Sequence, residues 1–318
     1  MTPAPPETTP VARAPHEGQG GRHLLVLAMG VLAVAWAAPF IRLSSDAGAA
    51  ALAIAALRLA FSAPPMVAAA ALTGARDLRG LTRRHWSLLV LSALALAFHF
   101  GLWVASLERT SVATSVVLVT AQPVFVSLGA WAFLRERPSR AVAVGIAVAL
   151  GGAALMVSDD WGDGGTMLGN AFALLAALAV SVYVVVGRDA RQRLSLASYG
   201  AVVYTATALM LLAAALATGT RLVGLEGEAY LWIALMAGVC QLGGHNAINW
   251  SLGALPAAVV AVAILGEPVM TSVIAGIVLD EVPTLLELSG GAVVLAGVYV
   301  ALRGARRPAR DLAEPVAM

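Results

Sequence analysis

The chain of 318 residues has a net charge of +2, is 60% hydrophobic and 12% charged, and has a mean hydropathy of +0.85. Soluble domains carry about 25% charged residues, so this composition predicts a protein whose solvent is lipid. The single cysteine, Cys240, excludes a disulfide framework and a cysteine-based metal site, and we expect it to be a small buried hydrophobe.

Ten apolar runs follow one another along the chain, each close to the roughly 20 residues that a helix needs to cross the hydrocarbon layer. Their expected extents are 24–43, 47–73, 85–107, 110–134, 140–158, 166–187, 195–217, 229–252, 255–279 and 284–303. The flanks, 1–23 and 304–318, are rich in Pro, Gly and charge and are expected to be disordered tails. The first run ends in an A-x-A-like pattern at Ala35-Trp36-Ala37, but its apolar stretch continues through Ile41, so we expect a retained span.

The placement of arginine predicts the orientation in the membrane. With a cytoplasmic N-terminus, sixteen arginines lie in cytoplasmic segments and only Arg42, Arg109 and Arg221 lie in outer loops. We therefore expect both termini, and the tails they carry, to be cytoplasmic.

Two segments 145 residues apart resemble each other: AQPVFVSLGAWAFLRERP (121–138) and GEPVMTSVIAGIVLDEVP (266–283). Pro123 then matches Pro268, and Glu136 matches Glu281. The predicted fold class is an all-α integral membrane protein with ten transmembrane helices in two inverted five-helix repeats, 24–158 and 166–303. The inversion follows because an odd number of spans brings the second repeat in from the opposite side. Such repeats recur in secondary transporters, whose substrate sites lie near the midplane between the repeats.

These features resemble the EamA family of the drug/metabolite transporter superfamily. The resemblance rests on the "RERP" and "DEVP" segments after the fourth and ninth spans, the "EPV" motif, the glycine-rich fifth and tenth spans, and the "AVAWAAPFI" and "ALRLAFSAPP" segments. It implies export of small metabolites such as amino acids across a bacterial inner membrane by alternating access.

Two polar residues are expected at the bilayer midplane. Gln122 and Glu267 lie near the centres of the fourth and ninth spans, and each precedes a proline, Pro123 or Pro268, that removes a backbone hydrogen bond and bends its helix. A charged side chain facing lipid there is costly, so such residues face a cavity or another helix. Glu267 is then either a structural brace or a substrate or proton site, and proton coupling is chemically feasible.

Arg58, in the second span, needs a buried partner for the same reason. The candidates are Glu267, backbone carbonyls near Pro64 and Pro65, and a substrate carboxylate, which arginine binds with a charge-assisted fork.

Further polar and aromatic residues are candidates for the lining of the substrate pathway. Gln241, His245 and Asn249 recur every four residues in the eighth span and form one stripe, with Asn246 and Trp250 beside it. The alternative is helix packing through polar side chains. The other candidates are His99 and Trp103, which share a face of the third span; Tyr183 and Tyr204, with interfacial anchoring as their alternative; and Trp36 with the bending Pro39 in the first span.

The function expected from these patterns is secondary transport of a small-molecule substrate, with no enzymatic activity. The alternatives are broad-specificity efflux, proton-coupled import, a channel and an intramembrane enzyme. The sequence contains no phosphate loop, metal motif or nucleophile motif, so we expect neither a cofactor nor a metal, and no nucleic-acid partner. We expect the glycines of the fifth and tenth spans to serve close helix packing, within the chain or in a dimer, and the sequence leaves the oligomeric state open between a monomer and a dimer.

Overall fold

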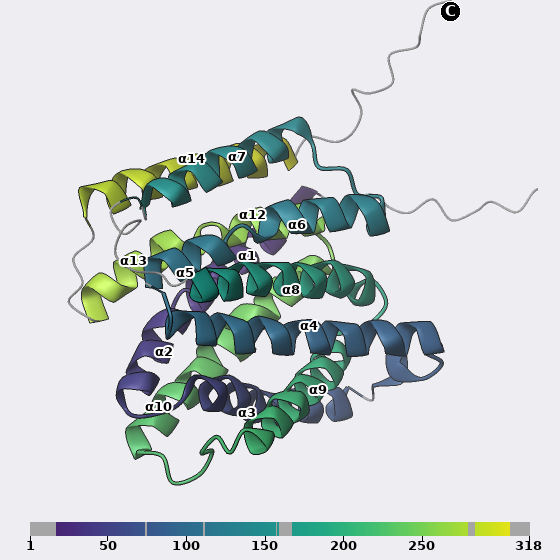
Figure 1. Ribbon diagram of the computed structural model, residues 1–318. Coiled ribbons are helices and arrows are strands. Elements are labelled where there is room, and N and C mark those ends of the chain that lie inside the picture. Colours follow the sequence, from purple (N-terminus) through teal and green to yellow (C-terminus); the bar gives the residue numbers. More distant parts are fainter. Residues whose placement is uncertain are drawn as a thin grey trace, which may run out of the picture.

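The computed structural model describes residues 17–73, 75–110, 112–156, 158, 167–278 and 284–305, and this part of the chain is helical (Figure 1). Residues 17–23 and 304–305, predicted to belong to disordered tails, are helical instead and form the start of α1 and the end of α14. The rest of the two predicted tails, 1–16 and 306–318, and Glu281 lie outside the described residues. The α-helices are α1 (Glu17–Val34), α2 (Ala37–Asp46), α3 (Ala51–Leu72), α4 (Arg83–Leu107), α5 (Val112–Val119), α6 (Gln122–Gly129), α7 (Arg140–Met156), α8 (Met167–Arg191), α9 (Leu196–Ala217), α10 (Gly227–Leu235), α11 (Asn246–Leu252), α12 (Ala257–Ile264), α13 (Glu267–Val278) and α14 (Leu285–Ala305). A 3₁₀ helix, η1 (Arg76–Leu78), and two π-helices, η2 (Ala130–Leu134) and η3 (Met236–His245), connect them.

Eight helical stretches of the described chain are long and apolar enough to cross a membrane. They are Gly21–Asp46, Ala51–Leu72, Arg83–Leu107, Ser115–Leu134, Met167–Arg191, Leu196–Ala217, Gly227–Leu252 and Ala257–Val278. Two shorter apolar helices, Arg140–Met156 and Leu288–Gly304, occupy the predicted fifth and tenth spans. The predicted all-α membrane fold is confirmed.

Two helices of the first repeat, α3 and α5, have counterparts of equal length in the second repeat. The helices α3 and α9 begin at Ala51 and Leu196, 145 residues apart, and both are 22 residues long. The short helices α5 and α12 begin at Val112 and Ala257, again 145 residues apart, and both are 8 residues long. The offset found in the sequence is therefore the offset of the three-dimensional repeat.

Equivalent helices of the two repeats run in opposite directions where they meet. Figure 1 shows α7 and α14 side by side along one edge of the bundle. A Cβ added to Gly145 would lie 2.6 Å from the Gly297 oxygen, and one added to Gly152 would lie 2.7 Å from the Gly290 oxygen. Rising numbers on α7 thus face falling numbers on α14, so the helices are antiparallel. The predicted role of these glycines in close helix packing is met within one chain.

The first span is broken near its middle. Pro39 has no N–H, so the Ala35 carbonyl lacks its usual helical donor, and α1 ends at Val34 while α2 begins at Ala37. The Thr271 hydroxyl donates to the Ala35 carbonyl at 3.0 Å. This bond satisfies a buried carbonyl and ties the first repeat to α13 of the second.

Candidate substrate cavity

Two further spans are broken at equivalent positions. In the fourth span α5 ends at Val119 and α6 begins at Gln122. In the ninth span α12 ends at Ile264 and α13 begins at Glu267. The cause is the same in both, because Pro123 and Pro268 each follow the first residue of the second half-helix and cannot donate to the carbonyl four residues earlier. Those carbonyls belong to Val119 and Ile264.

The broken helices enclose a cavity in the centre of the bundle. Its volume is about 50 Å³, measured as the space that the centre of a water molecule can occupy. Seven of the thirteen predicted pathway residues line it: Arg58, His99, Trp103, Gln122, Tyr183, His245 and Glu267. The apolar part of the lining consists of Val34, Ala37, Val119, Val180, Val184, Ile248 and Ile264. Val119 and Ile264, whose carbonyls lose their helical donors at Pro123 and Pro268, are thus part of the wall.

Arg58 is almost fully buried, with 1% of its surface exposed. Its Nε donates to Gln241 Oε1 at 3.0 Å, and its guanidinium carbon lies 4.2 Å from the centre of the Phe100 ring. Stacking on an aromatic face suits the planar guanidinium. Neither Glu267 nor a backbone carbonyl is the hydrogen-bond partner of Arg58, so those two predicted pairings are wrong. A substrate carboxylate, the third candidate, stays a prediction.

One nitrogen of Arg58, Nη2, has no hydrogen-bond partner within the described part of the chain. The same holds for two more buried atoms of cavity-lining residues, Trp103 Nε1 and Gln122 Oε1. Buried polar groups are almost always hydrogen-bonded in folded proteins. Three residues of the cavity lining therefore carry buried polar atoms without partners, two of them donors and one an acceptor.

Glu267 is half-buried at the cavity wall. Over the described ranges, with their gaps, its carboxylate forms neither a hydrogen bond nor an ion pair. A structural brace would require such a bond, so the contacts do not favour that alternative. The positive charge of the Arg58 guanidinium is near enough to attract the Glu267 carboxylate.

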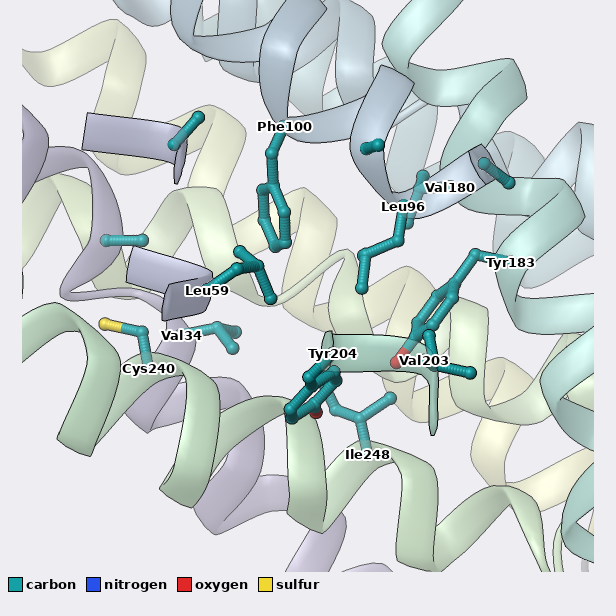
Figure 2. Close-up of a cluster of buried hydrophobic side chains, with 14 of the residues drawn as sticks. Val34, Leu59, Leu96, Phe100, Val180, Tyr183, Val203, Tyr204, Cys240 and Ile248 are labelled. Carbon is teal, nitrogen blue, oxygen red and sulfur yellow. The ribbon is translucent and has the colours of Figure 1, made fainter. Parts of the chain in front are cut away.

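A polar cluster lies directly behind the cavity wall. Asn249 Nδ2 donates to the hydroxyl groups of Tyr183, at 2.6 Å, and Tyr204, at 3.3 Å. Tyr204 donates in turn to Asn246 Oδ1 at 2.9 Å. Figure 2 shows Tyr183 and Tyr204 inside the core beside Ile248. Both tyrosines are buried, so interfacial anchoring is excluded for them, and only Tyr183 reaches the cavity.

The π-helix η3 changes the phase of the predicted polar stripe. It ends at His245, so the four-residue spacing of an α-helix does not hold between Gln241 and His245. Gln241 binds Arg58, His245 lines the cavity, and Asn249 holds the two tyrosines. The stripe is thus divided among three environments, and its prediction as one cavity-lining row is wrong.

Stacked aromatic rings form one side of the cavity. The rings of His99 and Trp103 lie 5.9 Å apart and nearly parallel, as their shared helix face predicts, and His99 Nδ1 is 3.1 Å from the Ala176 carbonyl. His245 packs edge-on against Phe100 at 5.5 Å. This wall offers flat surfaces against an apolar group.

Two predicted aromatic residues do not reach the cavity. Trp36 stacks on Phe40 at 5.5 Å beside the first helix break, and Trp250 stacks on His23 at 4.0 Å. The first contact lies within one span, and the second packs α11 against α1.

A second groove, about 550 Å³ by the same measure, lies between α3, α4 and α9. Apart from Glu108 and Arg109 it is lined by apolar side chains, including the exposed Phe98. This apolar lining is suited to contact with the acyl chains of lipids. The smaller central cavity, whose lining residues carry the unpartnered polar atoms, is therefore the candidate for the substrate site.

Comparisons with known proteins agree with this architecture. The profile of the EamA-like transporter family matches residues 22–158 and again residues 167–303. The chain belongs to the EamA-like transporter family. It is therefore a membrane transporter with two copies of the EamA unit, and the resemblance found in its motifs is confirmed at the level of the family.

Two individual proteins are similar to this EamA-like transporter. An uncharacterized transporter of Archaeoglobus fulgidus is 23% identical over 220 residues, which cover 68% of this chain and 75% of that protein. A solved structure titled only "Crystal structure of protein" superposes with a TM-score of 0.74 at 19% identity, covering 90% of this chain and 98% of that chain. At this identity the superposition shows the shared fold alone.

Across the described residues, no group of three or more His, Cys, Asp or Glu side chains is arranged to hold a metal ion.

One functional candidate was missed by the sequence reasoning. Glu136 was used only as a marker of the repeat, yet its carboxylate bridges both repeats, as described below. An acidic residue between two arginines at the end of a span was the available signal.

Proposed function

We propose that this transporter carries small metabolites with an amino and a carboxyl group, such as amino acids, by alternating access. The observation that carries the proposal is the set of unpartnered polar atoms on residues that line the cavity. Arg58 Nη2 and Trp103 Nε1 are donors suited to a carboxylate, and Gln122 Oε1 and the Glu267 carboxylate are acceptors suited to an ammonium group. A ligand with both groups would supply partners for these three buried atoms and for the half-buried Glu267 carboxylate.

The proposal includes a movement, because the cavity has room for only a few water molecules. The breaks at Pro123 and Pro268 supply the points about which half-helices can tilt. The two repeats give two nearly equivalent arrangements, one open to each face. We propose outward transport across a bacterial inner membrane with both termini cytoplasmic, as the arginine bias supports.

Coupling to protons is part of the proposal. Glu267 lacks a fixed partner in the described structure and lies beside the site. Ionised and neutral forms of a carboxyl that is partly withdrawn from water differ in solvation, so a proton on Glu267 would change the balance between arrangements. A proton gradient can then drive substrate movement through this one residue.

The test is uptake of a panel of radiolabelled amino acids into proteoliposomes, with and without a pH gradient. We expect saturable uptake of some members, a response to the gradient, and loss of that response in Glu267→Gln. The matched control is Glu228→Gln, which changes an exposed carboxylate that accepts from Trp232 Nε1. Absence of saturable uptake over the panel would contradict the substrate class, and an unchanged gradient response in Glu267→Gln would contradict the proton site.

A further inference from the structure

Glu136 lies at an unusual backbone turn that follows α6. The chain leaves α6 through the π-helix η2, and Arg135 then adopts a left-handed conformation with φ = 58°. The Glu136 N–H donates back to the Ala130 carbonyl at 3.1 Å, which closes the helix end. A left-handed residue that is not glycine persists only where its surroundings hold it. The turn directs the Glu136 side chain back toward the bundle.

The Glu136 carboxylate uses both of its oxygens on the second repeat. Oε1 accepts from Arg188 Nε of α8 at 2.8 Å, and Oε2 accepts from the Ala257 N–H at the start of α12 at 3.1 Å. Both side chains are mostly shielded, with 23% of Glu136 and 13% of Arg188 exposed. A shielded, charge-assisted pair of this geometry is much stronger than an exposed ion pair.

The corner between α11 and α12 is held by arginines as well. Arg188 Nη1 donates to the Leu252 carbonyl at 2.9 Å, and Arg191 Nε donates to the Asn249 carbonyl at 3.1 Å. Asn249 itself holds Tyr183, which lines the cavity. The contacts of these charged residues therefore meet at one corner, between the cavity and one face of the protein.

We propose that Glu136 and Arg188 form an ionic latch that closes this face of the transport pathway by fixing the α11–α12 corner against α8. The inference rests on the proposed alternating-access function. Opening of this face separates α12 from α8, which requires Glu136 to release the Ala257 N–H or the Arg188 guanidinium. Both are positioning residues, since neither lines the cavity.

Val184 allows a direct test, because it lines the cavity one helical turn before Arg188. Val184→Cys in a Cys240→Ser background would be labelled with a membrane-impermeant thiol reagent, from each face separately, in vesicles containing the full chain. Glu136→Gln keeps an acceptor for the Ala257 N–H and removes the charge. Arg188→Gln removes the same ion pair from the other side.

We expect either variant to raise the labelling rate about tenfold from the face that carries Arg188, a factor equivalent to about 1.4 kcal/mol. The double variant should show little further effect, since both changes remove one pair. The control is Asp77→Asn, which alters another carboxylate that accepts from a helix N-terminus, at Ser195, without touching the cavity. We expect no change in labelling for this control.

An unchanged rate in both single variants would overturn the latch. So would an equal rise from both faces, or an equal rise in Asp77→Asn, because general loosening of the bundle has those effects. Labelling needs no substrate, which separates the two proposals. Normal labelling effects without amino-acid uptake would contradict the proposed substrate class, whereas normal uptake without labelling effects would contradict the latch.

Discussion

Gln122 and Glu267 begin the second halves of two broken helices, 145 residues apart, and their side chains line the same cavity. They are repeat equivalents, but one is a neutral amide and the other an ionisable carboxyl. The two repeats thus have equivalent backbones here, but the side chains at these equivalent positions differ in their chemistry. In the proposed function, the repeat supplies the two alternating arrangements, and Glu267, the ionisable member of this pair, supplies the proton site.

Replacement of Arg58 tests the carboxylate site. Arg58→Gln should raise the KM for amino-acid uptake about 10-fold to 100-fold, because a hydrogen bond to a charged group contributes about 1.5–3 kcal/mol. Arg42→Gln is the control, since that arginine is 53% exposed and pairs only loosely with Asp46, at 3.8 Å. An unchanged KM in Arg58→Gln would show that the substrate carboxylate binds elsewhere.

Pro268→Ala tests the ninth-span hinge. The alanine N–H can donate to the Ile264 carbonyl and make the helix continuous, which should stabilise the protein by up to about 3 kcal/mol and slow transport. Thermal unfolding in detergent and uptake rates measure the two effects. Pro64→Ala is the control, because α3 stays a single helix around Pro64. Faster transport by Pro268→Ala would contradict a hinge at this position.

Two adjacent glycines provide a matched test of the α7–α14 contact. A Cβ at Gly152 would lie 2.6 Å from the Val294 nitrogen, whereas one at Gly151 would meet nothing within 4 Å. Gly152→Ala should lower the free energy of unfolding by about 1–3 kcal/mol through overpacking. Gly151→Ala should raise it by about 0.5–1 kcal/mol, the ordinary gain for alanine in a helix. Equal unfolding free energies for the two variants would refute the close contact.

Asp77 gives a prediction for stability against pH. Partial burial raises the pKa of Asp77, but hydrogen bonds from Ser198 and Ser195 outweigh this effect and lower the pKa overall. A lowered native pKa means that the stabilisation is complete above the unfolded pKa of about 3.9 and is lost as the pH falls through the native pKa.

The measurement is the unfolding midpoint between pH 5 and pH 2, in the wild type and in Asp77→Asn. We expect a smaller decline with acid in the variant, together with a lower midpoint at neutral pH. Parallel curves for the two proteins would show that Asp77 does not contribute to acid sensitivity.

The spans, the repeat and the helix breaks could be predicted from the sequence because each has a local cause. Apolar length sets a span, and a proline removes a particular hydrogen bond. Arg58 shows where this reasoning ends. Hydropathy indicates that Arg58 avoids lipid, but the packing of α3 against α4 and η3 decides that Phe100 and Gln241, rather than Glu267, contact it.

The π-helix η3 could not be predicted for a similar reason. Gly244 of η3 lies against the first span, where an added Cβ would be 2.6 Å from Val34 Cγ1 and 3.1 Å from the Gly30 carbonyl. Such a contact belongs to two helices that are far apart in the sequence. Only the assembled bundle therefore determines which residues of 236–245 face the cavity.

The central claim is that one cavity, between α5–α6 and α12–α13, opens to one face at a time. Exchange in proteoliposomes tests it most directly, by following the entry of a radiolabelled amino acid with and without unlabelled substrate on the opposite side. The account predicts saturable entry that is faster when unlabelled substrate is present on the opposite side. An entry rate that rises linearly with concentration and does not change with unlabelled substrate on the opposite side would indicate a channel and contradict the account.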